Sequence, residues 1–259
     1  MRVTILGSGS SSGTPAVDLG WGTCDPANPR NRRLRPSILV ERGTSRLLVD
    51  TSPDLRQQLL NAGVNRLDAV LFTHAHADHL HGIDDLRPVN RAMKRGLDIY
   101  ADRLTLDEIR SRFGYVFDPL ANGIEMFYKP VLVPHEIAPG QRFSVAGIPI
   151  AAFRQDHGFG DSLGFRFGPI AYSTDLADLP DDGFKALEGI QVWIVGTLAD
   201  TAHPTHAHVQ KALAWAQRVQ PRRLILTHIG VGLDHERLLQ ASLPSWAEPG
   251  FDGMVIETD

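Results

Sequence analysis

The stretch Thr73-His74-Ala75-His76-Ala77-Asp78-His79 follows directly after the apolar run from Leu67 to Phe72, and it places three imidazoles and one carboxylate within six residues. Borderline metals such as zinc bind neutral imidazole nitrogen and carboxylate oxygen at about 2 Å. In an extended segment alternate residues face the same side, so His74 and His76 can share one metal. Asp78 and His79 emerge past the bend, toward a second metal. A histidine-rich solvated turn is the alternative, but it does not explain why a strand of Val, Leu and Phe leads into it. The stretch therefore indicates a site for two metal ions.

This run is the HxHxDH motif of the metallo-β-lactamase superfamily, and the chain resembles that family well beyond the motif. The resemblance implies three further metal ligands, each after a strand-like apolar segment: His157 as the third histidine, Asp175 as the bridging carboxylate and His228 as the last histidine. Taken singly, a histidine is more often a hydrogen-bonded structural residue and an aspartate a helix cap, but their order and contexts favour ligation. Upstream, Asp50 resembles the family's aspartate that supports the metal loop without binding metal.

The resemblance also implies how the seven ligands divide between two divalent cations, for which zinc and manganese are the leading candidates. His74, His76 and His157 would hold the first metal, while Asp78, His79 and His228 hold the second and Asp175 bridges them. Room remains for water. A hydroxide held between the two metals would attack phosphorus in line, and the metals would offset charge on the phosphoryl oxygens.

Periodicity shows a mixed α/β chain. The expected strands lie near 2–6, 37–41, 46–50, 67–73, 97–101, 130–134, 142–154, 163–167, 169–174, 191–196, 223–227 and 254–257, and the expected helices near 54–62, 84–94, 105–113, 206–219 and 235–241. The resemblance implies that they form a four-layer αββα sandwich, and 259 residues suit one metallo-β-lactamase-like domain, residues 1–259. The segment between the metal loop and His157 is expected to shape the substrate cleft.

Composition limits the other classes of function. No apolar stretch is long enough for a signal peptide or a membrane span, so we expect a cytoplasmic protein with no membrane partner. The net charge of −4 argues against general nucleic-acid binding. A local exception is the group Arg30, Arg32, Arg33 and Arg35, which either holds a phosphate or a partner, or is a solvated loop. Relatives often form homodimers, and that assembly is a candidate here.

His206 is the candidate catalytic and substrate-binding residue. A helix is expected from His206 to Val219, with Thr205 as its N-cap, so His206 would lie in the first turn. Free N–H groups at a helix start attract anions, which suggests a phosphate pocket where His206 donates a hydrogen bond or a proton. His206 lies 22 residues before His228, and this spacing resembles the histidine that phosphodiesterase branches place beside the metals. Asp78 is counted with His206 as catalytic.

Several motifs resemble the branch of the phosphoribosyl 1,2-cyclic phosphate phosphodiesterases. They are the opening from Ile5 to Pro15, Gly22-Thr23-Cys24-Asp25-Pro26, Arg35-Pro36-Ser37 and Gly82-Ile83-Asp84-Asp85-Leu86-Arg87. The cysteine cluster that holds a separate structural metal in that branch is reduced to Cys24. The chain also lacks the long Gly-rich, basic arm of the tRNA 3′-processing nucleases, which favours a small substrate.

The leading interpretation is a dinuclear metal-dependent phosphoric diester hydrolase that opens a small cyclic phosphate diester of a sugar or nucleotide. A thioesterase or lactonase acting on a carbonyl carbon is the main alternative, because the same metal centre serves both reactions. A tRNA 3′-processing-type nuclease and a non-catalytic nucleotide- or metal-binding module are the others. The exact substrate and the physiological metal stay open at this point.

Overall fold

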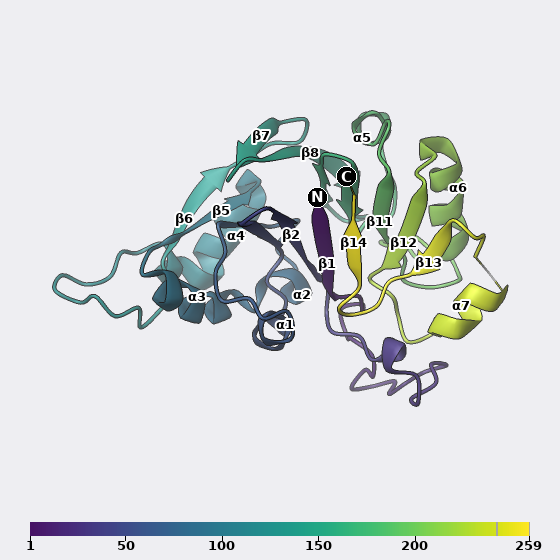
Figure 1. Cartoon of the computed structure of the whole chain (residues 1–259), viewed down its shortest axis with the longest axis horizontal. Coiled ribbons are helices and arrows are strands. Elements are labelled where there is room, and N and C mark those ends of the chain that lie inside the picture. The colour runs from purple at the N-terminus through teal and green to yellow at the C-terminus, as the bar shows by residue number, and fades with distance from the viewer. Residues whose placement is uncertain (242, 259) are drawn as a thin grey trace.

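The computed structural model describes residues 1–241 and 243–258, and it contains two seven-stranded sheets packed face to face (Figure 1). The first has the order β14 (Val255–Glu257), β1 (Arg2–Gly7), β2 (Ser37–Arg42), β3 (Ser45–Val49), β4 (Ala69–Leu71), β5 (Leu97–Ala101), β6 (Leu132–Glu136). The second has the order β13 (Ala247–Pro249), β12 (Arg223–Thr227), β11 (Val192–Gly196), β10 (Ile170–Ser173), β9 (Asp161–Phe167), β8 (Ile148–Asp156), β7 (Arg142–Val145). Each sheet is part antiparallel and part parallel.

Helices cover the outer face of each sheet. Over the first sheet lie α1 (Leu55–Asn61), α2 (Ala77–Leu80), α3 (Leu86–Met93) and α4 (Arg103–Phe113), and over the second lie α5 (Asp181–Ala186), α6 (Val209–Val219) and α7 (His235–Ala241). Short 3-10 turns occur at Pro29–Asn31, Ile83–Asp85 and Gly114–Val116. The αββα sandwich predicted from the sequence is therefore confirmed.

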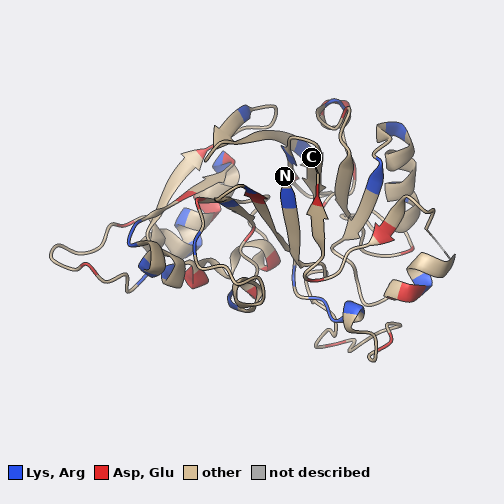
Figure 2. Ribbon diagram, viewed as in Figure 1, with Lys and Arg blue, Asp and Glu red and all other residues tan. Residues whose placement is uncertain are grey.

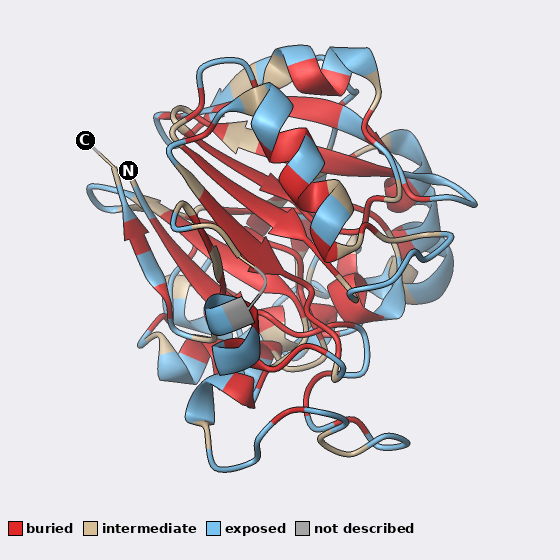
Figure 3. Cartoon of the chain, turned by 90° about the vertical axis from the view of Figure 1, so that its right-hand side faces the viewer, coloured by how far each residue is buried: buried red, intermediate tan, exposed pale blue. Residues whose placement is uncertain are grey.

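Alternation along the strands explains the four layers. In β3, Leu47 and Val49 face the other sheet while Leu48 faces the helices, and in β11 Ile194 faces inward while Trp193 packs under the helices. Strands buried on both faces read as continuous apolar runs, which is what the sequence has at these positions. Figure 3 shows the central strands buried and the outer sides of the helices exposed.

Two expectations about local structure were wrong. The single strand expected over 142–154 is two strands, because Ala146 and Gly147 both have positive φ (49° and 77°) and turn the chain between β7 and β8. The helix expected from His206 begins at Val209. The sequence analysis also missed α2, which carries Asp78 and His79 past the extended segment, as well as α5 and β13.

None of the described helices combines the length and the apolar character that a bilayer crossing requires. Figure 2 shows Lys and Arg interspersed with Asp and Glu on the helices over both sheets. A single domain and a homodimer stay predictions from the sequence.

The four arginines between Arg30 and Arg35 do not form one anion site. Arg33 is only 1% exposed, and its guanidinium donates to the backbone oxygens of Leu233 (2.9 Å) and Gly230 (3.4 Å), far along the chain. Arg35 is held by both carboxylate oxygens of Asp54. Arg33 therefore ties the N-terminal loop to the segment after β12, and this is a structural role.

Replacing Arg33 with alanine should lower the free energy of unfolding by about 3 kcal/mol, because buried carbonyl groups lose their donors. Urea denaturation followed by circular dichroism measures this. The matched control is Arg32→Ala, since Arg32 is exposed and only lies over the ring of Trp21. Equal stability of the two variants would contradict the structural role.

Candidate metal centre

The seven predicted ligands all follow the carboxyl ends of strands. His74, His76, Asp78 and His79 follow β4, His157 follows β8, Asp175 follows β10 and His228 follows β12. The first sheet thus supplies four of them and the second sheet three. Asp175 and His228 have positive φ (45° and 54°), an unfavourable conformation that turns each side chain sharply off its strand. The fold therefore brings both halves of the sequence to one place.

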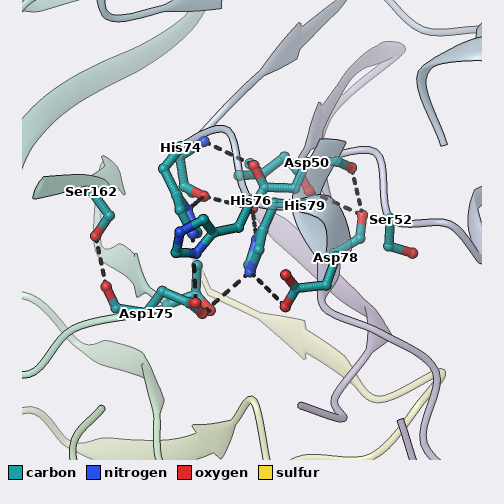
Figure 4. A network of polar contacts seen from close by, with 12 residues as sticks. Asp50, Ser52, His74, His76, Asp78, His79, Ser162 and Asp175 are labelled. Atoms are coloured by element: carbon teal, nitrogen blue, oxygen red, sulfur yellow. Dashed lines mark hydrogen bonds and ion pairs between the residues drawn. The ribbon is translucent and has the colours of Figure 1, made fainter. Parts of the chain in front are cut away.

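The side chains form two groups that share Asp175 (Figure 4). In one group, His74, His76, His157 and Asp175 each offer a ligand atom, and in the other Asp78, His79, His228 and Asp175 do so, with the atoms of a group within 4.8 Å of one another. The two oxygens of Asp175 face different groups. Oδ2 lies 3.6 Å from His74 Nε2 and 3.4 Å from His157 Nε2, whereas Oδ1 lies 3.2 Å from His79 Nε2 and 3.0 Å from His228 Nε2.

The donor set fits divalent metal ions. The Nε2 atoms of His74 and His79 are buried and make no hydrogen bond, although each points at a carboxylate. A buried polar atom without a partner is costly, and a cation between nitrogen and oxygen would satisfy it. Mixed imidazole and carboxylate ligands suit zinc and also manganese. Metal binding by these groups stays a prediction.

Charges in the centre also favour a cation. Burial would raise the pKa of Asp175, but His228 and His79 outweigh it and hold that pKa well below its usual value. The same balance lowers the pKa of Asp78. For His79 burial would lower the pKa, but Asp175, Asp78 and Asp50 outweigh it and raise the pKa well above 6.5. The carboxylates are thus ionised and attract positive charge, for which protons and metal ions compete.

Asp50 holds the metal loop in place, as its resemblance to the family's supporting aspartate suggested. It is fully buried, and its Oδ1 accepts the backbone N–H of Thr73 at 2.8 Å. Its Oδ2 lies 2.8 Å from Thr73 Oγ1 and 2.7 Å from His79 Nδ1. With Nδ1 donating to Asp50, the Nε2 of His79 is left free to face the metal position. His157 is oriented in the same way, since its Nδ1 lies 2.7 Å from the backbone oxygen of Thr205.

His206 lies beside the two groups but not on a helix. Its ring centroid is 4.8 Å from that of His228 and 4.9 Å from that of His157. The predicted N-cap role of Thr205 and the phosphate pocket at a helix start were wrong, because α6 begins at Val209 with His208 as its N-cap. Residues 206–208 lie outside the helix, since Ala207 donates to the backbone oxygen of Leu176 and His208 forms a β-bridge with Ala199.

Burial and the neighbouring His228 lower the pKa of His206 to about 3. Its imidazole is therefore neutral near pH 7 and offers an N–H as a hydrogen-bond donor. Asp78, the other residue predicted to be catalytic, lies within the second group, with its Oδ2 3.4 Å from His228 Nε2. A catalytic role for either residue stays a prediction.

A cavity of about 370 Å³ opens onto this centre. It is lined by His74, His76, Asp78, His157, Asp175 and His206, together with the start of α4 and the turn between β8 and β9. The sequence analysis missed Leu104 and Phe159 on its walls, although a phenylalanine between Gly158 and Gly160 in a polar turn is a visible signal. A larger cavity of about 490 Å³, beside β7 and α5, contains none of the predicted ligands.

Comparisons with known proteins agree with this fold. A family model described as "Beta-lactamase superfamily domain" matches residues 45–229. The crystal structure of a new diphosphatase from the PhnP family aligns with a TM-score of 0.87 and 30% identity, covering 99% of this chain and 97% of that one. Zinc-bound PqqB from Methylobacterium extorquens aligns with a TM-score of 0.75 at 19% identity, which shows a shared fold.

Two curated relatives are longer than this chain. The octanoyltransferase of Porphyromonas gingivalis is 34% identical over 264 residues, which cover 100% of this chain and 52% of that protein. A ribonuclease Z of Bradyrhizobium sp. is 35% identical over 160 residues, which cover 58% of this chain and 48% of that protein. The chain thus spans about half the length of these relatives.

Adding zinc to chelator-treated protein should raise the melting temperature, because a ligand that binds only the folded state stabilises it. We expect Asp175→Ala to bind fewer metal ions per chain by elemental analysis and to show a smaller rise, since Asp175 faces both groups. Asp200→Ala is the control, because Asp200 is an exposed carboxylate outside both groups. Full metal content in Asp175→Ala would refute the bridging role.

Asp50→Asn should weaken metal binding about 10- to 100-fold, as is typical when a group that orients a ligand is changed. The amide cannot accept from both Thr73 and His79 with the geometry that the carboxylate allows. A competition titration against a chromophoric chelator measures the affinity. An affinity equal to that of the unmodified protein would show that Asp50 does not orient His79.

Proposed function

Because this chain belongs to the metallo-β-lactamase superfamily, we propose that it is a metal-dependent phosphodiesterase that opens a small cyclic phosphate diester. The single observation that carries the choice of phosphorus is the likeness to a PhnP-family diphosphatase over 99% of the chain, at 30% identity. The chain is a hydrolase of this superfamily, and we propose further that the bond it cleaves is a phosphodiester.

In this proposal two divalent ions, zinc or manganese, occupy the two groups. His74, His76 and His157 would hold the first, Asp78, His79 and His228 would hold the second, and Asp175 would be the ligand shared by both. When bound, such ions lower the pKa of water and withdraw charge from phosphoryl oxygens. His79 and His157 each offer the ring nitrogen that their hydrogen bonds to Asp50 and Thr205 leave free.

His206 then binds the substrate from the wall of the cavity. Its neutral imidazole donates an N–H hydrogen bond to a phosphoryl oxygen or to the leaving alkoxide and so stabilises the negative charge that develops there, while water protonates the alkoxide after it leaves. Its position is tied to the metal centre, since Thr205 accepts from His157 and Gly158 packs against the same segment. A Cβ on Gly158 would meet the oxygen of Pro204 at 2.7 Å, so a larger residue at this position would push the two segments apart.

Hydrolysis at a carbonyl carbon is the second candidate. A match over the whole of this chain to a protein named as an octanoyltransferase favours it, although the match covers only 52% of that protein. A tRNA 3′-processing activity has the ribonuclease Z relatives in its favour, but the net charge of −4 is a poor match for a polyanion.

The test is phosphorus NMR of metal-loaded protein with a cyclic phosphodiester, beside an acyl thioester followed by thiol release. We expect ring opening to a monoester and little thioester turnover. The proposal would be refuted if the thioester were hydrolysed faster than the cyclic phosphodiester is opened, or if no ring opening occurred with both metals bound.

His206→Ala should reduce kcat about 10²- to 10³-fold while metal content stays unchanged, because the residue donates a hydrogen bond to the substrate and does not hold the metals. The control is His203→Ala, an exposed histidine three residues earlier whose ring lies 5.2 Å from that of His206. Loss of metal in His206→Ala would instead assign the residue to the metal centre.

A further inference from the structure

The walls of the cavity outside the metal centre determine which non-reacting groups of a substrate can fit there. They are built mainly by one face of α4 (Arg103–Phe113) with its N-cap Asp102, by the turn at 157–161 between β8 and β9, and by Ser11 of the N-terminal loop. None of these residues is a predicted metal ligand except His157. Their side chains face whatever part of the substrate is not reacting.

Positive charge is scarce on these walls. Among the described residues that line the cavity, Arg112 is the only lysine or arginine. Its guanidinium is already engaged, with Nη1 donating to the backbone oxygen of Ala75 at 2.7 Å and Nε and Nη2 donating to Glu108 at 3.0 and 2.7 Å. A phosphate is usually held by arginine forks, lysines or a helix start. The walls therefore offer no free cationic side chain to a second phosphate.

Negative charge is more abundant there. Besides the metal-ligand candidates, three carboxylates line the cavity: Asp102, Glu108 and Asp161. Asp102 accepts the backbone N–H of Thr105 at 2.8 Å and so caps α4, which places a carboxylate at this helix start. Both oxygens of Asp161 accept hydrogen bonds from Arg154, and Glu108 is paired with Arg112. Among the described residues only Asp102 of these three carboxylates has no ion-pair partner, so the walls offer no free cation to a further anionic group but can accept hydrogen bonds from hydroxyls.

Two apolar side chains stand at the opening. Phe159 is 95% exposed and Leu104 is 74% exposed, and both line this cavity. The turn that carries Phe159 is well defined, because His157 donates to the oxygen of Gly160 at 2.8 Å and Gly158 donates to Asp156 Oδ1 at 2.7 Å. Single exposed apolar residues are common, but two on the rim of one polar cavity form a surface on which an apolar or planar group can pack.

We propose that the cleft selects diesters whose non-reacting part is uncharged and carries a planar ring, that Phe159 stacks on this ring, and that a second phosphate is rejected. This inference rests on the proposed phosphodiesterase function and specifies its substrate class. Hydroxyl groups of the same part would meet Asp102 and Glu108. Phe159 is then a specificity-determining residue rather than part of the reacting centre.

Three cyclic diesters separate the contributions of ring and charge. Adenosine 2′,3′-cyclic phosphate has the ring, its 5′-phosphorylated form adds only the second phosphate, and glycerol 1,2-cyclic phosphate lacks the ring. We expect kcat/KM to be highest for the first and about tenfold or more lower for each of the others, as stacking and charge discrimination of this kind typically give.

Phe159→Ala should raise KM for adenosine 2′,3′-cyclic phosphate about tenfold and leave glycerol 1,2-cyclic phosphate unchanged, whereas Phe159→Tyr should keep the preference. The matched control is Leu60→Ala, an apolar residue 61% exposed on α1 and outside this cavity. Calorimetry with adenosine 2′-phosphate and adenosine 2′,5′-bisphosphate provides a readout that does not depend on turnover. We expect the bisphosphate to bind more weakly, and Phe159→Ala to weaken binding of both.

The outcomes distinguish the two proposals. Equal or better use of the 5′-phosphorylated diester, with tighter binding of the bisphosphate, would overturn the charge selection while the phosphodiesterase function stands. If Phe159→Ala lowered kcat/KM by the same factor for all three diesters, the stacking role would be overturned. If no diester is opened by metal-loaded protein, the proposed function fails, and equal binding of both adenosine ligands by Phe159→Ala and the unmodified protein would overturn the ring site as well.

Discussion

One carboxylate connects the two halves of this molecule. Asp175 stands after the end of β10 in the second sheet, and its Oδ1 lies 3.2 Å from Nε2 of His79, which lies on α2, after β4 of the first sheet. Its other oxygen faces His74 and His157. Other parts of the structure hold the carboxylate and the imidazoles at these distances. Asp50 fixes His79, Thr205 fixes His157, and the apolar layer between the sheets fixes the strands from which all of them emerge.

Three residues of the centre have an unfavourable backbone conformation, and packing of the core must supply the free energy that holds them in it. Asp50, Asp175 and His228 all have positive φ, between 45° and 65°, and a non-glycine residue in that region costs about 1 to 2 kcal/mol. Aspartate and histidine tolerate it better than branched residues do. The strands before them are buried on both faces, so a shift of register would expose apolar side chains and is strongly disfavoured. Rigid strands therefore hold the strained residues where their side chains meet.

Much of this arrangement could be predicted from the sequence, because the signals are local. The motif from His74 to His79 has its own spacing, and the apolar runs before Asp175 and His228 are continuous, as strands covered on both sides require. The start of α6 could not be predicted in the same way. Thr205 is a good N-cap by composition, but the tertiary contacts of Ala207 and His208 keep the chain extended as far as Val209. Phe159 and Arg112 were missed since a cavity wall is built from segments about fifty residues apart, which no periodicity relates.

The origin of the ligands in two different sheets has a consequence for folding. His74 and His228 are separated by about 150 residues, and their side chains come together only once both sheets have formed and packed. Contacts between residues so distant in sequence form late, because the entropy cost of closing a large loop comes before the contacts can stabilise the chain. A metal ion held by both sheets would therefore leave the early steps of folding untouched and act on the reverse process. It would slow the separation of the sheets, so that the lifetime of the folded chain, more than its rate of formation, would depend on metal supply.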